Sequence, residues 1–184
     1  EAKPVIPSAI DETAVIAIGN SAFYNCTALT EIEIPSSVTK IGEDAFKNCS
    51  KLEKLTLNEG LTTLGANCFE NTKISSVNIP STLTSVNMPS YDDHGPFYKS
   101  TTLKEVAIDD NAAIIPGYLF EKCSALETID IPYAVRTIGI SAFEGCTSLK
   151  DITIHNPYCN IYNKDYTISS GATIHGYTPS TAKN

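Results

Sequence analysis

Apolar and polar residues alternate in short stretches along the whole chain, and each stretch predicts a half-buried β-strand. In the first stretch Leu29, Ile32 and Ile34 are apolar, and Glu31 and Glu33 stand between them. A period of two places successive side chains on opposite faces of a strand, so one face is apolar and the other polar. Five later stretches repeat the apolar positions: Leu52/Leu55/Leu57, Ile74/Val77/Ile79, Leu103/Val106/Ile108, Leu126/Ile129/Ile131 and Leu149/Ile152/Ile154.

A phenylalanine precedes each of these stretches at a nearly constant spacing. The spacing is 23 residues, except between Phe69 and Phe97, where it is 28. A fixed period between about 20 and 50 residues is typical of stacked repeats, in which one unit packs on its neighbours to bury its apolar face. We therefore expect about six similar coils around one continuous core. The phenylalanines are Phe23, Phe46, Phe69, Phe97, Phe120 and Phe143.

The remainder of each unit contains an apolar pair that ends in glycine, as at Val38, Ile41 and Gly42. A glycine at this point suits a tight corner with a positive φ. Residues that favour helix N-termini, such as Ser21 and Asp44, stand two positions before most of the phenylalanines. We predict that each coil consists of a strand, a bend, a short extended segment and a helical turn.

The middle and the end of the chain depart from this pattern. Thr72 and Ser100 stand where other units have cysteine, and Pro116 stands where glycine is usual. Residues 87–96 are an insertion, which in stacked repeats emerges as a surface loop. These departures predict uneven curvature near the middle. Residues 158–184 lack a further phenylalanine unit, so we expect a C-terminal cap of two or three short strands.

Composition and charge narrow the possible functions. The chain of 184 residues is 42% hydrophobic, which is enough for a continuous core, and its formal net charge is -8. An acidic chain without a lysine or arginine cluster argues against binding to nucleic acid or to anionic membranes. No apolar run reaches the roughly 18 residues of a transmembrane helix. We expect no cofactor, no membrane insertion in this segment and a monomeric chain.

Four cysteines share one repeat position, three residues after phenylalanine: Cys26, Cys49, Cys123 and Cys146. A free cysteine behaves as a small hydrophobe that is often buried, so packing inside the coil is the first interpretation. Disulfides between adjacent coils are the alternative in an exported chain. No Cys-x-x-Cys pair occurs, so the sequence predicts no zinc site.

The candidate binding residues occupy the outward positions of the predicted strands. They are polar and net acidic, and they include none of the aromatic residues that often anchor interfaces. A merely solvated sheet face is the alternative interpretation. The candidates are Glu31, Glu33, Lys54, Thr56, Asn78, Glu105, Thr128, Asp130 and Asp151.

A second candidate group lies in the insertion and consists of Tyr91, Asp92, Asp93 and His94. Its carboxylates and imidazole suit contact with a ligand or a metal ion, and a solvated turn is the alternative. We predict no catalytic residues, because the three histidines lie in distant coils and no serine has a neighbouring base.

The unit A-F-x-x-C-x-x-L-x-x-I-x-I-P-x-x-V-x-x-I-G recurs over about residues 13–157 and resembles the BspA-like (Treponema-type) leucine-rich repeat. Residues 172–182 also resemble the terminal segment that often follows such repeats. The resemblance implies an α/β solenoid, a superhelix of about six 23-residue coils with a parallel β-sheet on the concave face. The usual crossover rule makes it right-handed. The resemblance further implies bacterial proteins that are secreted or at the cell surface, and it supplies no catalytic residues.

We therefore expect a single leucine-rich-repeat domain over 1–184, with a lead-in at 1–12, repeats at 13–157 and a cap at 158–184. The expected function is non-catalytic binding, or host-surface adhesion, by a secreted or cell-surface bacterial protein. Its partner is a protein or a glycan. A structural spacer that presents another module of a longer protein is the alternative. The first residues do not read as a signal peptide, so we expect none within this chain.

Overall fold

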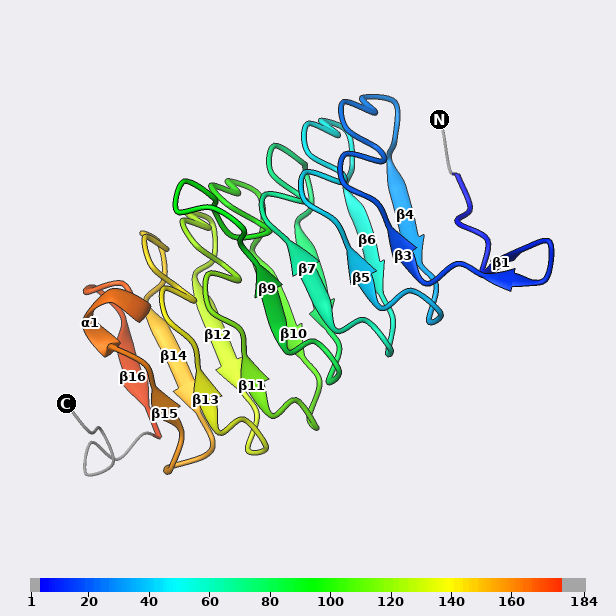
Figure 1. The fold of residues 1–184 in the computed structure, drawn as a ribbon. Coiled ribbons are helices and arrows are strands. Elements are labelled where there is room, and N and C mark those ends of the chain that lie inside the picture. The colour runs from blue at the N-terminus through cyan, green and yellow to red at the C-terminus, as the bar shows by residue number, and fades with distance from the viewer. Residues whose placement is uncertain (1–3, 177–184) are drawn as a thin grey trace.

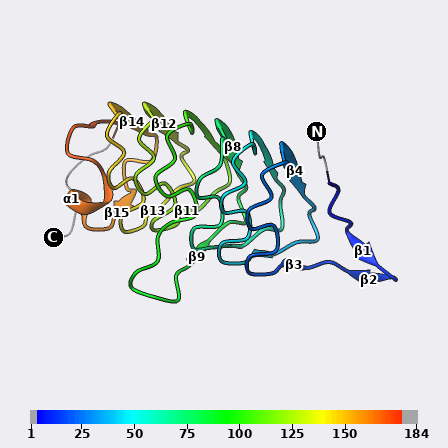
Figure 2. The same cartoon turned by 90° about the horizontal axis from the view of Figure 1, so that it is seen from above.

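The computed structural model describes residues 4–176, over which the chain winds into a stack of coils (Figure 1). Each coil contributes one short strand and one longer strand, and the two kinds lie on opposite sides of the stack (Figure 2). The predicted repeat solenoid is therefore confirmed. Residues 4–176 contain seven such strand pairs, because the expected cap continues the stack.

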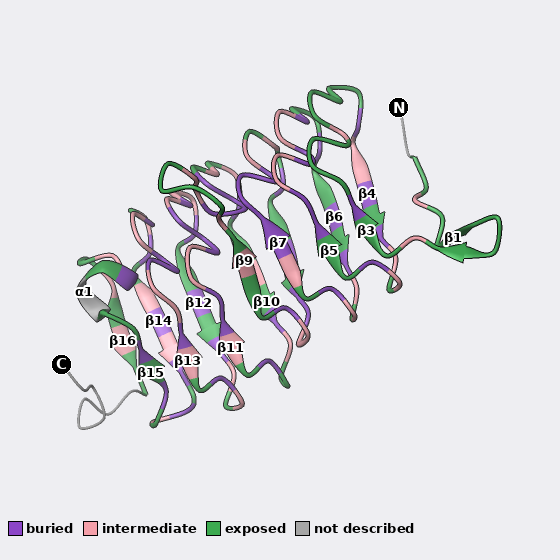
Figure 3. Ribbon diagram, viewed as in Figure 1, coloured by how far each residue is buried: buried purple, intermediate pink, exposed green. Residues whose placement is uncertain are grey.

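The longer strands form the side of the stack that carries the predicted alternation. Their apolar residues are mostly buried, and in Figure 3 buried positions alternate with more exposed ones along most of these arrows. Within each of the two sheets that these strands form, neighbours pair in parallel, and Ile32 lies opposite Leu55. The strands are β4 Glu31–Ile34, β6 Lys54–Leu57, β8 Ser76–Ile79, β10 Glu105–Ile108, β12 Thr128–Ile131, β14 Asp151–Ile154 and β16 Thr173–His175.

The shorter strands stack on the other side and correspond to the apolar pairs that end in glycine. They also pair in parallel, as Ile18 with Ile41. The strands are β3 Ala17–Ile18, β5 Lys40–Ile41, β7 Thr63–Gly65, β9 Ser85–Asn87, β11 Ile114–Ile115, β13 Thr137–Ile138 and β15 Asn160–Ile161.

The phenylalanine rings form one stack through the core. Successive ring centroids lie 4.9 to 6.0 Å apart, and the widest separation is between Phe97 and Phe120. The five rings from Phe46 onward are at most 1% exposed. Phe23 is only partly buried, because no earlier coil in the described chain covers it. Inward packing of the phenylalanines is therefore confirmed.

The helical turn expected before each phenylalanine is wrong. Around Phe46, Asp44 and Asn48 both adopt left-handed backbone angles, with φ of 54° and 64°. The amides of these three residues donate to carbonyl oxygens of the next coil at 2.8 to 3.0 Å. A helical turn directs its amides back along its own segment. The chain instead makes two tight turns, which keep these amides available for bonds between coils.

The positive φ expected at the glycines after the short strands is also wrong. Positive φ among described glycines occurs at Gly60, Gly145 and Gly176. Gly42 is required for another reason, because a Cβ there would lie 2.5 Å from the backbone nitrogen of Asn20 in the preceding coil. Gly42, Gly65 and Gly139, which share this repeat position, therefore permit the close approach of adjacent coils.

Residues 158–176 form a divergent seventh coil, in which β15 pairs with β13 and β16 pairs with β14. The short helix α1, Lys164–Thr167, replaces the paired turns of the other coils. Buried Ile168 forms a parallel bridge with Phe143, and the Oγ of Ser169 donates to the Phe143 carbonyl oxygen at 3.2 Å. The remainder of the predicted terminal segment, 177–182, lies outside the described residues.

The predicted lead-in, of which residues 4–12 are described, ends in a hairpin that continues to residue 14. The strand β1, Ala9–Ile10, pairs antiparallel with β2, Thr13–Ala14. Asp11 and Glu12 between them have φ of 46° and 64°, which matches the left-handed two-residue turns favoured in hairpins. The hairpin projects beyond the first coil (Figure 1).

Both ladders are interrupted at one junction, between the coil of β9 and β10 and the coil of β11 and β12. The long strands divide into a sheet of β4 to β10 and a sheet of β12 to β16, and the short strands divide at the same junction. The amides of Gly42 and Gly139 donate to the preceding coil, whereas Pro116 at the same repeat position has no N–H. The irregular residues of the middle therefore coincide with a break in hydrogen bonding, and uneven curvature there stays a prediction.

Candidate functional site

The outward residues of β4, β6, β8, β10, β12 and β14 form one polar surface, which we call the strand face. The register aligns them in two rows, with Glu31 opposite Lys54 and Glu33 opposite Thr56. The fold thus brings together candidates that lie up to five coils apart in sequence. The predicted binding residues on β6 to β12 are exposed, and they are Lys54, Thr56, Asn78, Glu105, Thr128 and Asp130. Their role in binding stays a prediction.

Two histidines extend this surface at its C-terminal end, and sequence inspection did not select them as site residues. The Nε2 atom of His155 lies 2.7 Å from Oδ1 of Asp130, and that of His175 lies 2.8 Å from Oδ1 of Asp151. His155 follows β14 and His175 is the last residue of β16, and each imidazole reaches back one coil. Within residues 4–176 neither imidazole has a hydroxyl or thiol hydrogen-bond partner, so the two pairs fit a binding surface better than nucleophilic catalysis.

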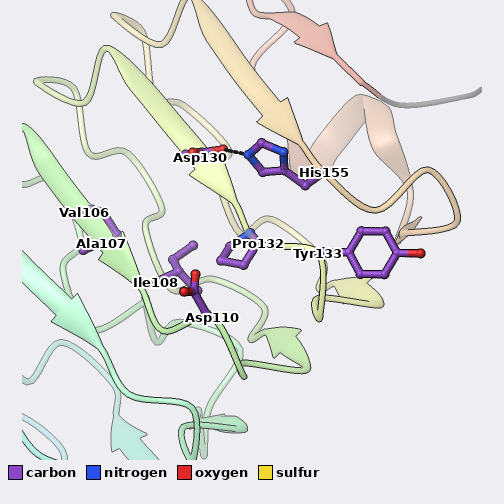
Figure 4. Close-up of a pocket in the computed structure, with 8 residues that line it drawn as sticks. All are labelled: Val106, Ala107, Ile108, Asp110, Asp130, Pro132, Tyr133 and His155. Atoms are coloured by element: carbon purple, nitrogen blue, oxygen red, sulfur yellow. Dashed lines mark ion pairs between the residues drawn. The ribbon is translucent and has the colours of Figure 1, made fainter.

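A hollow of about 690 Å³ opens on this side of the molecule at the broken ladder, and we call it the notch. Its β10 side consists of Val106, Ala107 and Ile108. Asp110 follows β10, while Pro132 and Tyr133 follow β12. In Figure 4, Pro132 and Ile108 lie between Asp110 on one side and the Asp130–His155 pair on the other.

The notch combines an apolar floor with two carboxylates. Ile108 is 8% exposed and Pro132 is half-buried, so both present apolar surface at the base. Asp110 and Asp130 are exposed, and no lysine or arginine lines the hollow. Asp110 makes no ion pair within the described chain. Of these residues only Asp130 was predicted, because the hollow results from the junction and not from a local motif.

The insertion contributes to the same junction from the turn side of the coils. The ring of His94 stacks on Tyr98 with centroids 3.6 Å apart, and its Nδ1 lies 3.4 Å from Oε1 of Glu121. The buried Glu121 carboxylate also accepts from the amide of Gly95 at 3.2 Å. Lys122 donates to the Tyr98 hydroxyl at 3.3 Å, and this hydrogen bond raises the pKa of Lys122. These contacts join the two coils where no strand ladder does.

The predicted insertion site is therefore divided by the fold. His94 is engaged by Glu121 and Tyr98, whereas Tyr91 and Asp92 are exposed on the projecting loop. Asp93 accepts from the amide of Ser90 at 2.6 Å, which closes the loop on itself. No group of three or more metal-binding side chains occurs among the described residues. Ligand binding by this loop stays a prediction.

The cysteine row packs inside the coils, as predicted, at Cys49, Cys123 and Cys146. Each Sγ donates to the carbonyl oxygen of the phenylalanine in the preceding coil, at 3.1 to 3.3 Å. All six cysteines are free thiols, so the alternative of disulfides between coils does not hold here. For Cys26 the inward prediction is wrong, because no earlier coil covers it and it is exposed.

We expect native protein to react rapidly with a disulfide reagent such as DTNB at one thiol, that of Cys26. Burial raises the pKa of Cys49 to about 11 and that of Cys146 to about 12, so their reactive thiolates form only in strong alkali. Absorbance should show one reactive thiol in buffer at mildly alkaline pH and all six in guanidinium. Cys26→Ser should abolish the native reaction, and two or more rapid native thiols would contradict the packing of the row.

The comparison with protein families finds one match. The family described as "BspA type Leucine rich repeat region (6 copies)" matches residues 10–95 and 93–175. A comparison with curated proteins finds no match. Within residues 4–176, no helix is long and apolar enough to cross a membrane.

Solved structures that share the fold of this chain include two bacterial proteins. The leucine-rich-repeat protein TpLRR of Treponema pallidum is 23% identical with a TM-score of 0.60, over 90% of this chain and 77% of that one. The pneumococcal vaccine antigen PcpA is 20% identical with a TM-score of 0.61, over 86% of this chain. This chain corresponds to 40% of the length of the antigen. At these identities the likeness shows a common solenoid fold.

Proposed function

Because this chain belongs to the BspA-type leucine-rich-repeat family, we propose that it is a non-catalytic binding domain of a secreted or cell-surface bacterial protein. On this proposal residues 1–184 act as one monomeric domain, and the ligand is a protein that docks on the strand face. The leucine-rich-repeat solenoid is a protein-interaction fold whose stacked strands provide an extended surface. The family resemblance supports export, and host-surface adhesion is the role that it suggests.

The observation that carries the proposal is the openness of the strand face. Both rows are exposed along β6 to β12, so the surface is continuous over several coils. A stable protein interface buries about 800 Å² on each partner, which needs an extended area rather than a small pocket. The face is rich in carboxylates, which favours a partner with a basic surface.

The test is binding to a panel of immobilised extracellular-matrix proteins and to a displayed peptide library. We expect saturable binding that the combined variant Glu33→Lys, Asp130→Lys and Asp151→Lys weakens at least tenfold. Asp11→Lys, Glu12→Lys and Asp92→Lys together form the matched control, because they add the same charge away from the strand face. Equal loss in both variants would show that net charge, rather than this face, determines binding.

A structural spacer is the second candidate, and it is favoured by the absence of tryptophan from the chain and of aromatic residues from the outward positions of the strand face. A spacer predicts no saturable partner in the panel and no enriched peptide in the library. Under that outcome the strand face is simply a solvated sheet surface, and the function belongs to a neighbouring module.

A further inference from the structure

We propose that the notch between β10 and β12 binds a lysine or arginine side chain of the protein partner and anchors the interface there. This inference rests on the proposed function, and it adds the chemistry that the partner presents at one defined point. Three observations carry it: the gap in the ladder, the apolar floor and the carboxylates on either side.

The shape of the notch suits an elongated side chain. Ala107 pairs in register with Asn78 and is the one apolar residue in its row of the strand face, so its methyl group leaves room above β10. The ladder that joins the other long strands is absent between β10 and β12. The facing edges of β10 and β12 therefore form no ladder with each other.

The chemistry of the notch matches both parts of a basic side chain. Lysine and arginine have an apolar stem and a charged head, and they bury the stem on apolar surface while the head stays near water or a counter-charge. Ile108, Ala107 and Pro132 provide the apolar surface, and Asp110 and Asp130 provide carboxylates on either side of it (Figure 4). Hydrogen bonds between a cationic donor and a carboxylate are stronger than neutral ones.

The charges around the notch favour a cation over other ligands. Its carboxylates repel an acidic partner, and the only basic group in its lining, His155, is already paired with Asp130. Asp110 is left without an ionic partner within residues 4–176. Sugar rings usually stack on an aromatic face, but Tyr133 is 67% exposed at the rim and points away from the floor (Figure 4).

The experiment is a titration of the full ¹⁵N-labelled chain with the blocked tripeptide acetyl-Gly-Arg-Gly-amide, followed by NMR. We expect saturable shifts confined to the amides of β10, β12 and residues 109–111 and 133. The glutamate counterpart, acetyl-Gly-Glu-Gly-amide, should leave these amides unchanged. Addition of salt should weaken the binding of the arginine peptide, because salt screens the attraction between exposed charges.

Two variants test the assignment without disturbing the core, since the side chains are exposed. Asp110→Asn with Asp130→Asn removes both carboxylates, and we expect at least tenfold weaker binding of the arginine peptide. Ala107→Lys places a cation of the chain itself in the notch and should abolish binding. Ala107→Thr, which installs the residue found at position 56, is the control and should bind within about threefold of wild type.

The proposal would be overturned if the arginine peptide shifted amides outside the notch. It would also be overturned if the variant with both Asp110→Asn and Asp130→Asn bound the peptide with unchanged affinity. If the neutral disaccharide N-acetyllactosamine shifted the amides of the notch and the arginine peptide did not, the ligand of the notch would be a glycan and the proposal would be wrong. The notch proposal can fail while the proposed binding function holds. A protein partner that binds wild type and Ala107→Lys equally shows that the strand face works without the notch.

Discussion

Replacement of Phe46 by alanine is expected to destabilise the chain by about 3–5 kcal/mol, as for other buried aromatic truncations. The ring is fully buried and stacks between Phe23 and Phe69, with centroids 4.9 and 5.4 Å away. Alanine removes contacts with the coils on both sides at once, and each coil is stable only through its neighbours. Guanidinium titration followed by circular dichroism gives the change in the free energy of unfolding.

Thr56→Ala is the matched control because Thr56 lies in the same coil, on β6, but faces solvent. A surface substitution of this kind usually changes stability by less than about 0.5 kcal/mol. Equal unfolding midpoints for the two variants would show that the inward and outward assignments of this coil are incorrect.

Replacement of Gly95 by alanine is expected to cost at least about 3 kcal/mol, at the upper end for overpacked sites. A Cβ on Gly95 would lie 1.7 Å from the carbonyl oxygen of Tyr118 and 2.8 Å from its carbonyl carbon. Neither backbone can retreat easily, because the Gly95 amide donates to the buried Glu121 carboxylate. The variant should also open the junction, where no strand ladder holds the coils together.

Hydrogen exchange locates this effect. In Gly95→Ala we expect faster exchange in residues 97–123, while the amides of β4, β6 and β8 keep their protection. Gly171→Ala is the control, since a Cβ there meets nothing within 4 Å and φ is not positive. Wild-type stability of Gly95→Ala would show that the insertion does not approach the next coil as closely as described.

Much of the candidate surface could be predicted from sequence alone, and the notch could not. A period of two assigns Glu33, Thr56 and Asp130 to the outward face without reference to other coils. The notch depends on where the two ladders are interrupted, which the alternating pattern of β10 and β12 does not reveal. The apolar Ala107 in a polar row, and Pro116 without an amide, were the only local signs of it.

The errors at the turns have a common physical cause. Asp44 and Ser21 are frequent at helix N-termini, but they also tolerate the left-handed region, and local preference does not decide between the two. The choice is made by the next coil, whose carbonyl oxygens accept the amides on either side of Phe46. In the same way, the sequence around Gly42 predicts a tight turn, whereas in the structure Gly42 leaves room for the backbone of Asn20 in the adjacent coil.

The amino-acid sequence by itself determined the period, the strands, the inward and outward faces and the phenylalanine stack, since these follow from repeated burial of the same positions. Only the tertiary structure decided which coils share a ladder, where the ladders are interrupted and how His94, Glu121 and Tyr98 join the coils at that junction. The reason is that burial pattern is a property of each coil alone. Contact between coils depends on the fit of two backbones, and a single methyl group or a missing amide changes that fit.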